Sequence, residues 1–147
     1  GWMVGPAEVI QACWRRHEYA AIAATIFSMK LADYALAETA REKLRARARA
    51  LIRQGFDTFT AALNSHPGVF SVVAPQASAM SFPRFDLPIS SEDLARRLLK
   101  EENVLVIPGT KFGVESHFRF SSALLEEHLQ AGLSRFNSVI AKVMVGD

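Results

Sequence analysis

Two apolar runs separated by a Pro-Gly break make up residues 103–122, Asn103-Val-Leu-Val-Ile-Pro-Gly-Thr-Lys-Phe-Gly-Val-Glu-Ser-His-Phe-Arg-Phe-Ser-Ser122. Residues 104–107 and 118–121 have the length and composition of strands, and the break between them is typical of a turn. The second run contains a single cation, Arg119. A guanidinium is not readily discharged, so an arginine in a strand pairs with a carboxylate, reaches solvent or binds an anionic ligand. The pattern alone leaves these three alternatives open.

A closing helix is predicted after the second run. Over residues 123–143 the apolar side chains recur at intervals of mostly three or four, which marks a wide apolar face for packing against a sheet. A shorter helix is predicted over residues 90–100, where Ser90 or Ser91 caps the N-terminus and two acidic residues follow in the first turn.

Two further strands are predicted before the shorter helix, over residues 69–73 and 79–85. Pro83 lies inside the second of them and predicts an edge position or a bulge, because proline donates no backbone hydrogen bond. With the two runs of the quoted stretch, these strands predict an α/β fold in which helices cover a small sheet of about four strands.

The longest helical pattern covers residues 29–64. Gly55 is the only residue in it that weakens a helix, by about 1 kcal/mol relative to alanine, and we expect a bend or break there. The pattern also contains a run of cations at mostly alternate positions, which spread around a helix and have no interleaved aromatic residues to stack bases. A solvated helix surface is therefore expected, and no nucleic-acid partner.

The quoted stretch resembles the end of a class I/II aminotransferase, a pyridoxal-phosphate (PLP) enzyme of fold type I. The matching positions are Val106, Pro108, Gly109, Phe112, Gly113, His117, Arg119 and Ser121. In that family the arginine binds the α-carboxylate of the substrate, so the resemblance implies this role for Arg119. The chain departs from the family in its loop, where Val114-Glu115-Ser116 replaces a stretch that is often Gly-rich, and this leaves the loop geometry open.

The resemblance covers nearly the whole chain and implies three segments. Residues 1–28 look like a remnant of the large PLP-binding domain, with a strand end over residues 1–4, a helix over residues 6–17 and a segment near the dimer interface. Residues 29–64 look like the linker helix between the two domains. Residues 65–147 look like the C-terminal small domain of a fold type I PLP enzyme.

The lysine that binds PLP covalently in this family has no counterpart in the chain. Gly1-Trp2 looks like the tail of the family's Ser-x-x-Lys…Arg-x-Gly-Trp segment, which implies that the lysine lies just upstream. None of the lysines present follows a Ser-x-x pattern. The resemblance therefore implies part of a longer enzyme with PLP as cofactor, in which this chain supplies no catalytic and no cofactor-binding residue. The chain alone is expected to be inactive.

Two residues join Arg119 as candidates for substrate binding. In related enzymes the strand matching residues 79–85 brings an aromatic or polar side chain near the substrate, so Phe82 and Arg84 are candidates for side-chain specificity. Core packing for Phe82 and solvent exposure for Arg84 are the alternatives. His117 lies two residues before Arg119, on the same strand face, where it orients the arginine or fills the strand end.

Composition and charge bound the remaining possibilities. Half of the residues are hydrophobic, 22% are charged and the net charge is +2, which is typical of a globular domain. No apolar run approaches the roughly 20 residues of a membrane-spanning helix, and the histidines lack metal-ligand spacing. A single cysteine, Cys13, permits no internal disulfide. We expect a cytoplasmic protein with no membrane partner and no metal.

The expected activity is transfer of an amino group between an amino acid and a 2-oxo acid, by a homodimer. Two alternatives stay open, because one fold supports several functions. The same fold serves PLP-dependent lyases and cyclases, and an aminotransferase-like domain also binds the effector in some transcription regulators. Nothing in these residues separates the alternatives.

Overall fold

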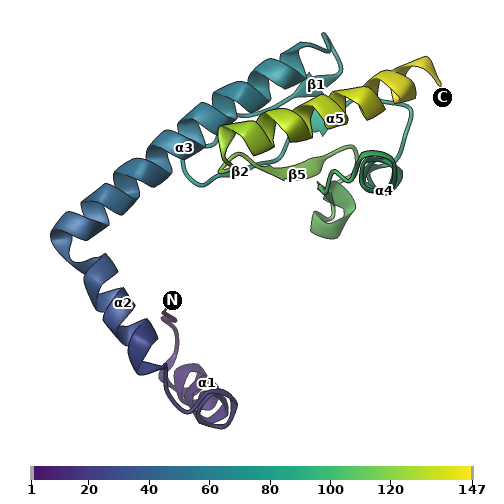
Figure 1. The fold of residues 1–147 in the computed structure, drawn as a ribbon. Helices are drawn as coiled ribbons and strands as arrows, with labels where there is room; N and C mark the ends of the chain where they lie inside the picture. Colours follow the sequence, from purple (N-terminus) through teal and green to yellow (C-terminus); the bar gives the residue numbers. More distant parts are fainter. Residues whose placement is uncertain (1, 147) are drawn as a thin grey trace. The chain divides into compact units, whose positions relative to one another are not determined.

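The computed structural model describes residues 2–146 (Figure 1). By its internal contacts the chain divides into two compact units, and the boundary falls inside the longest helix: the N-terminal unit ends at Arg45 and the C-terminal unit begins at Ala46. No helix in the described part of the chain is both long and apolar enough to cross a membrane.

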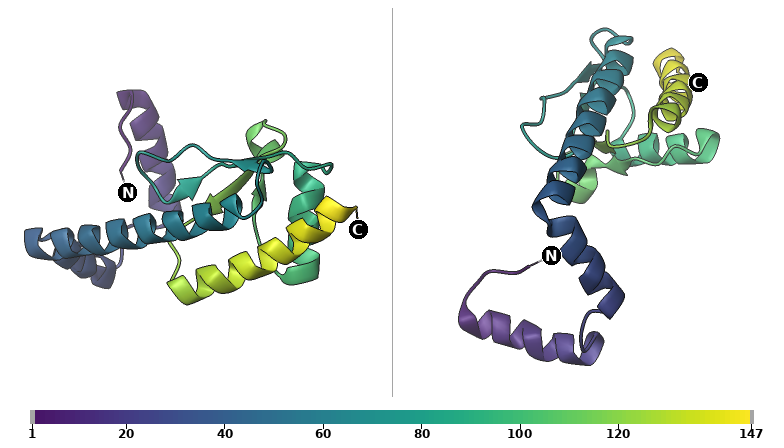
Figure 2. Two further views of the ribbon diagram at one scale, coloured as in Figure 1. Left: turned by 90° about the horizontal axis from the view of Figure 1, so that it is seen from above. Right: turned by 60° about the vertical axis from the view of Figure 1, so that its left-hand side comes forward.

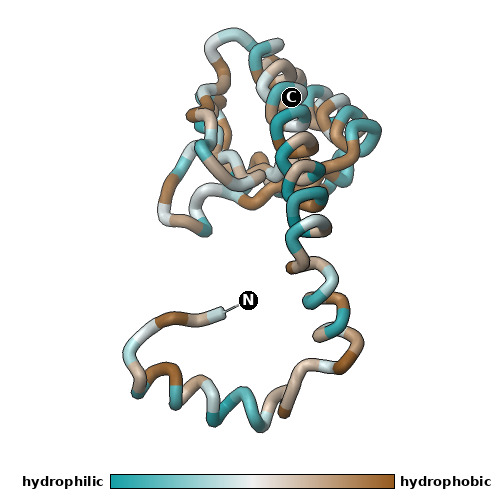
Figure 3. The backbone as a smooth tube through the Cα atoms, turned by 90° about the vertical axis from the view of Figure 1, so that its left-hand side faces the viewer, coloured by the Kyte–Doolittle hydropathy of each residue, from teal (hydrophilic) through white to brown (hydrophobic). Residues whose placement is uncertain are grey.

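The N-terminal unit consists of helices α1, Ala7–Ala20, and α2, Ile26–Leu36, followed by the first turns of α3, Glu38–Asn64. Neither α1 nor α2 contains a buried residue, although hydrophobic positions recur along this unit (Figure 3). Residues 2–6 form no strand, so the strand end expected over residues 1–4 is wrong for residues 2–4. A strand needs a neighbour for its hydrogen bonds, and no described segment pairs with these residues.

The single helix predicted over residues 29–64 is interrupted at Ala37, which lies between α2 and α3 in an extended conformation with φ −55° and ψ 138°. The Ala37 N–H still donates to the carbonyl of Asp33, and its carbonyl still accepts from the N–H of Arg41. Both helix ends therefore keep hydrogen bonds through the break. No glycine or proline marks the position, which is why helix propensity did not indicate it.

At Gly55, where a bend was expected, α3 continues without interruption. Gly55 is buried, and a Cβ atom there would overlap the carbonyl oxygen of Ser122. The glycine lets the helix lie directly against the backbone that follows the last strand, so its role is close approach and not flexibility.

The C-terminal unit contains two small antiparallel sheets. The strands are β1 (Phe70–Ser71), β2 (Met80–Ser81), β3 (Arg84–Phe85), β4 (Ile107–Pro108) and β5 (Phe118–Ser121). One sheet pairs β1 with β3, and the other has the order β2-β5-β4. The last predicted strand, over residues 118–121, is confirmed with its bounds.

The strand predicted over residues 79–85 is divided at Pro83, so the four expected strands become five. Before the proline, Ser81 pairs with Phe120 of β5; after it, Arg84 pairs with Ser71 of β1. Pro83 donates no hydrogen bond, but its carbonyl accepts from the N–H of Phe118 at 3.2 Å. The chain therefore passes from one sheet to the other at Pro83.

Three helical segments complete the unit: α4 (Ser91–Glu102), the 3₁₀ turn η1 (Gly109–Phe112) and α5 (Glu126–Val145). Ser90 is confirmed as the N-cap of α4, since its hydroxyl accepts from the N–H of Asp93. Helix α5 begins three residues later than expected, and it runs alongside the C-terminal half of α3 (Figure 2). The Glu126 carboxylate accepts hydrogen bonds from Gln54 and Thr58 of α3, which ties the two helices together.

The hydrophobic core lies between these helices and the strands. Phe59 of α3 stacks on Phe120 of β5 with ring centroids 3.9 Å apart, and Phe118 contacts Phe136 of α5. The buried core residues are Phe59, Leu63, Phe85, Leu94, Leu98, Val106, Phe118, Leu129, Leu133, Phe136, Val139, Ile140 and Val143. All of them belong to the C-terminal unit, whose α/β architecture confirms the predicted fold class.

Candidate functional site

Strand β5 places Arg119 on the face of the sheet opposite to the core. Side chains alternate between the two faces of a strand. Phe118 is only 1% exposed and Phe120 stacks on Phe59, so both neighbours of Arg119 point toward the core. Arg119 itself is half-buried. Its guanidinium is therefore held near the surface of the other face, which we call the open face.

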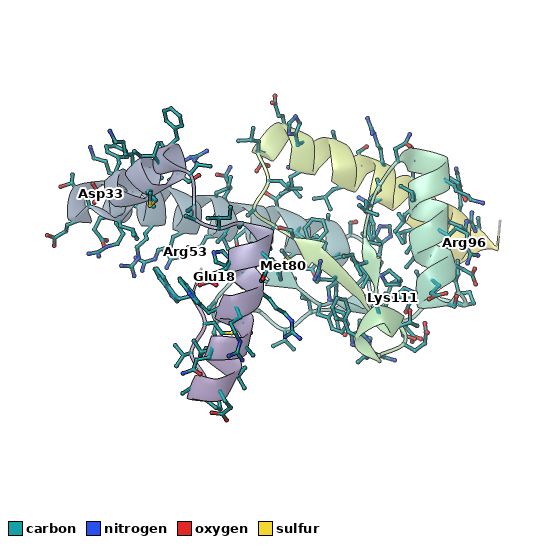
Figure 4. All side chains as sticks on the ribbon, turned by 90° about the horizontal axis from the view of Figure 1, so that it is seen from below. Glu18, Asp33, Arg53, Met80, Arg96 and Lys111 are labelled. Carbon is teal, nitrogen blue, oxygen red and sulfur yellow. The ribbon has the colours of Figure 1, made fainter. Side chains whose placement is uncertain are left out.

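The open face has a shallow pocket of about 280 Å³ beside Arg119. Met80, Ser81 and Phe82 line it from β2 and the residue that follows, and Phe112 lines it from η1 (Figure 4 labels Met80). The guanidinium carbon of Arg119 lies 5.3 Å from the centroid of the Phe112 ring, within cation–π range. Aromatic and sulfur-containing side chains thus surround the cation.

Three rings, those of Phe82, Phe112 and His117, pack together at this pocket. Phe82 packs edge to face against Phe112 at 5.6 Å between centroids, and its ring stacks on His117 at 5.0 Å. His117 is tied to the backbone as well, with its Nδ1 2.7 Å from the carbonyl oxygen of Glu115. The prediction that His117 and Arg119 share a strand face agrees with these contacts, since both touch the pair formed by Phe82 and Phe112.

No carboxylate balances the charge of Arg119 within the described chain. Among residues 2–146, no Asp or Glu oxygen lies within 4.0 Å of its guanidinium. A cation–π contact replaces only part of the hydration that a half-buried guanidinium loses, and an anion in the pocket would supply a stronger, charge-assisted interaction. Arg119 was expected to pair with a carboxylate, reach solvent or bind an anionic ligand, and the first of these is excluded for the carboxylates of residues 2–146.

The loop after β4 brings Phe112 into place. Gly109 is buried, its N–H donates to the carbonyl of His117 at 2.7 Å, and a Cβ atom there would come within 2.8 Å of the His117 side chain. Gly113 and Ser116 both have positive φ, at 74° and 56°. The loop therefore closes without a Gly-rich stretch, because Ser116 adopts the left-handed conformation that glycine usually supplies.

The sequence matches the family described as aminotransferase class I and II over residues 1–136. The chain belongs to this family. The resemblance seen in residues 103–122 is thereby confirmed, and the match extends over most of the chain.

Individual aminotransferases show how much of a family member the chain represents. The aspartate aminotransferase of Streptomyces avermitilis is 29% identical over 97% of this chain but only 36% of its own length. The LL-diaminopimelate aminotransferase of Oleidesulfovibrio alaskensis is 36% identical over 62% of this chain and 24% of its length. A solved PLP-dependent aminotransferase from Streptococcus suis has the same fold, with a TM-score of 0.83, 23% identity, and coverage of 97% of this chain and 37% of that one.

The described residues of this chain offer no lysine beside Arg119 for covalent binding of PLP. Lys111 pairs with Glu92 at 2.8 Å and Lys142 pairs with Glu101 at 3.2 Å, so both amines already have carboxylate partners. The remaining lysines, Lys30, Lys43 and Lys100, are exposed. No lysine lines the pocket at Arg119. Within residues 2–146, no group of three His, Cys, Asp or Glu side chains is placed to hold a metal ion either.

The structure brings two of the three candidate site residues together. Phe82 lies in the same pocket as Arg119, partly exposed, and is not a core residue. Arg84 is exposed and does not line that pocket; its backbone bridges His117 across the gap between the two sheets. On a single strand over residues 79–85, Phe82 and Arg84 would share a face, but the chain passes from one sheet to the other at Pro83, which separates them.

Three residues of the pocket, Met80, Ser81 and Phe112, were not predicted as site residues. Met80 was missed although it lies two positions before Phe82 and therefore shares its strand face. Phe112 matched the family motif, but nothing in the sequence indicated that its ring would lie beneath the guanidinium. The period of two could have identified Met80, whereas the position of Phe112 depends on the fold of the loop.

Proposed function

We propose that this chain is the C-terminal part of a PLP-dependent aminotransferase that transfers an amino group between an amino acid and a 2-oxo acid, with Arg119 binding the substrate α-carboxylate. The observation that carries the proposal is the half-buried guanidinium on the open face, balanced by no carboxylate among residues 2–146. Relatives that match most of the chain and are named as aminotransferases support it.

Arg119 is suited to hold a carboxylate in one orientation. A guanidinium presents two parallel N–H groups to a carboxylate, and such a bidentate pair is stronger and more directional than a neutral hydrogen bond. The Phe112 ring restricts the guanidinium from one side, so its rotation is limited before the substrate arrives. Binding in this way would fix the direction of the substrate's Cα–H bond, which is the positioning contribution of this chain to catalysis.

PLP, when bound, supplies an electron sink that stabilises negative charge at the substrate's α-carbon. In our proposal the cofactor is held by residues that this chain does not contain, since none of its described lysines is placed for that task. The chain spans only about 36% of the length of its relative from Streptomyces avermitilis, which leaves ample room for a cofactor site in a longer protein.

The remaining candidates take different proposed roles. Phe82, in the pocket with Arg119, is proposed to contact the substrate beside its carboxylate. Arg84 is proposed only as a contact with an acidic side chain of a larger substrate, because it lies outside the pocket and faces solvent.

A homodimer is proposed as the functional assembly. Tyr19 and Phe27 of the N-terminal unit are 95% and 78% exposed, and many other large apolar side chains there are exposed as well. Exposed apolar surface of this extent typically marks a contact with other protein. We also propose a cytoplasmic location, which agrees with a chain whose single cysteine, Cys13, forms no disulfide within it.

The test is the steady-state kinetics of Arg119→Ala in the full-length gene product that contains this chain. The expected result is a fall in kcat/KM for an amino acid by about 100-fold or more, with no comparable fall for the amine that lacks the carboxylate, because loss of a charge-assisted bidentate pair costs roughly 3 kcal/mol. Arg135→Ala, an exposed arginine of α5, is the matched control.

Unchanged kinetics in Arg119→Ala would contradict the assignment of the carboxylate site. A full-length protein that binds an amino acid yet never forms a 2-oxo acid from it would favour the effector-binding alternative. Release of ammonia or a cyclic product would instead favour a lyase or cyclase of the same fold.

A further inference from the structure

The loop that supports Arg119 has few contacts of its own. Residues 109–117 carry Phe112, under the guanidinium, and His117, which stacks on Phe82. Phe112 is 47% exposed, so burial does little to hold it. Within the loop, Gly113 N–H donates to the carbonyl of Thr110, Val114 N–H to that of Gly109, and Gly109 N–H to that of His117. From outside the loop, the N–H of Phe85 in β3 donates to the Ser116 carbonyl at 2.8 Å, and the first turn of α4 adds contacts to both ends of the loop.

The first turn of α4 supplies such contacts to the front of the loop. The Glu92 carboxylate accepts from the Lys111 amine at 2.8 Å and from the Thr110 hydroxyl at 3.3 Å. Lys111, labelled in Figure 4, lies in η1 directly before Phe112, beside α4. The turn that presents the Phe112 ring is thereby attached to the helix.

The same turn of α4 holds the back of the loop through Ser91 and Glu115. The Glu115 carboxylate accepts from the backbone N–H of Ser91 at 2.6 Å and from that of Ser116 at 3.1 Å. The Ser91 hydroxyl in turn accepts from the N–H of His117 at 3.3 Å. Ser91 is only 1% exposed, so this side of the contact is fixed by the core.

Both acidic residues are ionised in these positions at neutral pH. The Lys111 amine, by hydrogen bond and by charge, and the Thr110 hydroxyl hold the pKa of Glu92 below its ordinary value. The Ser91 hydroxyl, followed by the backbone N–H groups of Ser116 and Ser91, holds the pKa of Glu115 below its ordinary value. Charged acceptors make stronger hydrogen bonds than neutral ones.

We propose that Ser91, Glu92 and Glu115 form a clamp that positions the Phe112 and His117 supports of Arg119, and that Glu115 is a positioning residue for substrate carboxylate binding. The proposal rests on the proposed function of Arg119. Glu115 never contacts the substrate; it acts by holding residues 115–117 against α4, so that the rings beneath the guanidinium keep their places.

The test is Glu115→Ala in the full-length gene product, with KM and kcat measured for an amino acid and for the corresponding amine. We expect KM for the amino acid to rise about 10-fold, since small displacements of a positioning group have large kinetic effects. The amine, which offers Arg119 no carboxylate, should show no change. Glu115→Gln keeps an acceptor oxygen for the Ser91 N–H and should give a smaller rise.

Glu101→Ala is the matched control. Glu101 lies at the other end of α4 and accepts from Arg97 and Lys142, so its loss removes charged hydrogen bonds of the same kind without touching the loop. Its KM for the amino acid should stay at the wild-type value even where its melting temperature falls. A KM rise of equal size in Glu101→Ala and Glu115→Ala would overturn the proposal, because general destabilisation would then explain both.

A double mutant separates this proposal from the proposed function. If Arg119→Ala alone leaves amino-acid kinetics unchanged, the carboxylate assignment fails and the clamp has no site to serve. If Arg119→Ala is impaired and Glu115→Ala is not, only the clamp is overturned. The expected result is that Glu115→Ala adds no further loss in the Arg119→Ala background, as for residues acting through one another. Should the alanine variant fail to fold, a wild-type KM in Glu115→Gln overturns the clamp.

Discussion

Both units of the chain are rich in apolar residues but use them differently. In the C-terminal unit, Phe59, Leu94 and Ile140 are fully buried in one continuous core. In helices α1 and α2 no residue is buried, and Trp14, Tyr19 and Phe27 face solvent. An amphipathic pattern thus shows that a helix has an apolar face. Whether that face is buried depends on which other elements pack against it.

The difference predicts where stability resides. Burial of apolar area is the main stabilising term in folding, so substitutions in the C-terminal unit should change the free energy of unfolding, while equal substitutions in α1 and α2 should not. Paired substitutions in the 147-residue chain change the same kind of side chain or contact in two environments, and the pair with the largest expected difference comes first.

Phe59→Ala and Phe27→Ala form the first pair. Phe59 is 0% exposed and stacks on Phe120, whereas Phe27 is 78% exposed. Truncation of a buried phenylalanine costs about 3 to 5 kcal/mol, and an exposed one changes stability by about 0.5 kcal/mol or less. Urea unfolding followed by circular dichroism measures both. Equal losses would show that the N-terminal unit has a core of its own.

Gly55→Ala and Gly132→Ala compare two glycines in helices. At Gly55 a Cβ atom would overlap the Ser122 carbonyl, so α3 must move and we expect a loss of about 2 to 3 kcal/mol despite the better helix propensity of alanine. At Gly132 of α5 no atom lies within 4 Å of the added Cβ, and alanine should stabilise by up to about 1 kcal/mol. Thermal unfolding of both variants checks the opposite signs. A stabilised Gly55→Ala would disprove the close approach of α3 to β5.

Ser90→Ala and Thr25→Ala remove helix caps, one from each unit. Ser90 caps α4 by accepting from Asp93, and Thr25 caps α2 by accepting from Ser28. Loss of a cap costs about 1 kcal/mol, so Ser90→Ala should lower the melting temperature of the C-terminal unit by roughly 4 to 8 °C. Thr25→Ala should leave that transition in place and reduce only the helical signal of the N-terminal unit. A lower melting temperature in both variants would mean that the units unfold together.

The smallest expected difference concerns acid stability. Because the folded pKa of Glu115 is below its ordinary value of 4.5, the ionised group stabilises the fold above that value, and the contribution is lost as pH falls through the lower folded pKa. Glu115→Gln should therefore melt below wild type at pH 7, and the gap should close well below about pH 4.5. Glu42→Gln, which breaks an exposed ion pair with Arg45 in the N-terminal unit, should match wild type throughout. A gap for Glu115→Gln that persists in acid would mean that the charge is not what stabilises the loop.

The elements predicted from sequence are those with strong local signals. The Ser90 cap, the strand over residues 118–121 and the helices near residues 90–100 and 123–143 appear as expected within a few residues. The break at Ala37 was missed, because alanine neither caps nor breaks a helix and the conformation there has no local sequence cause. The bend expected at Gly55 was wrong, since local propensity is overruled when a helix must approach another backbone closely.

In the candidate site, too, residues with a local sequence signal differ from contacts that form only in the folded chain. Arg119 drew attention as a lone cation in an apolar strand, and the family resemblance made it a candidate for the substrate carboxylate. The position of the Phe112 ring beneath the guanidinium was not predictable from the sequence. The hydrogen bond between Glu115 and Ser91 was not predictable either, because it joins residues 24 positions apart. Arg84 was named with Phe82 because the resemblance places the strand over residues 79–85 near the substrate, and only the structure shows that the two residues lie on either side of the switch at Pro83.

By itself, the sequence determined most of the order of helices and strands in the C-terminal unit, the small apolar strand that carries one arginine, and the family, since each depends on spacing and residue type along the chain. Only the tertiary structure decided which amphipathic helices are buried, why Gly55 must be glycine, and that α4 fastens the loop beneath Arg119. The physical reason is that periodicity states which face of an element is apolar, whereas burial, close approach and loop contacts depend on elements that meet only after folding.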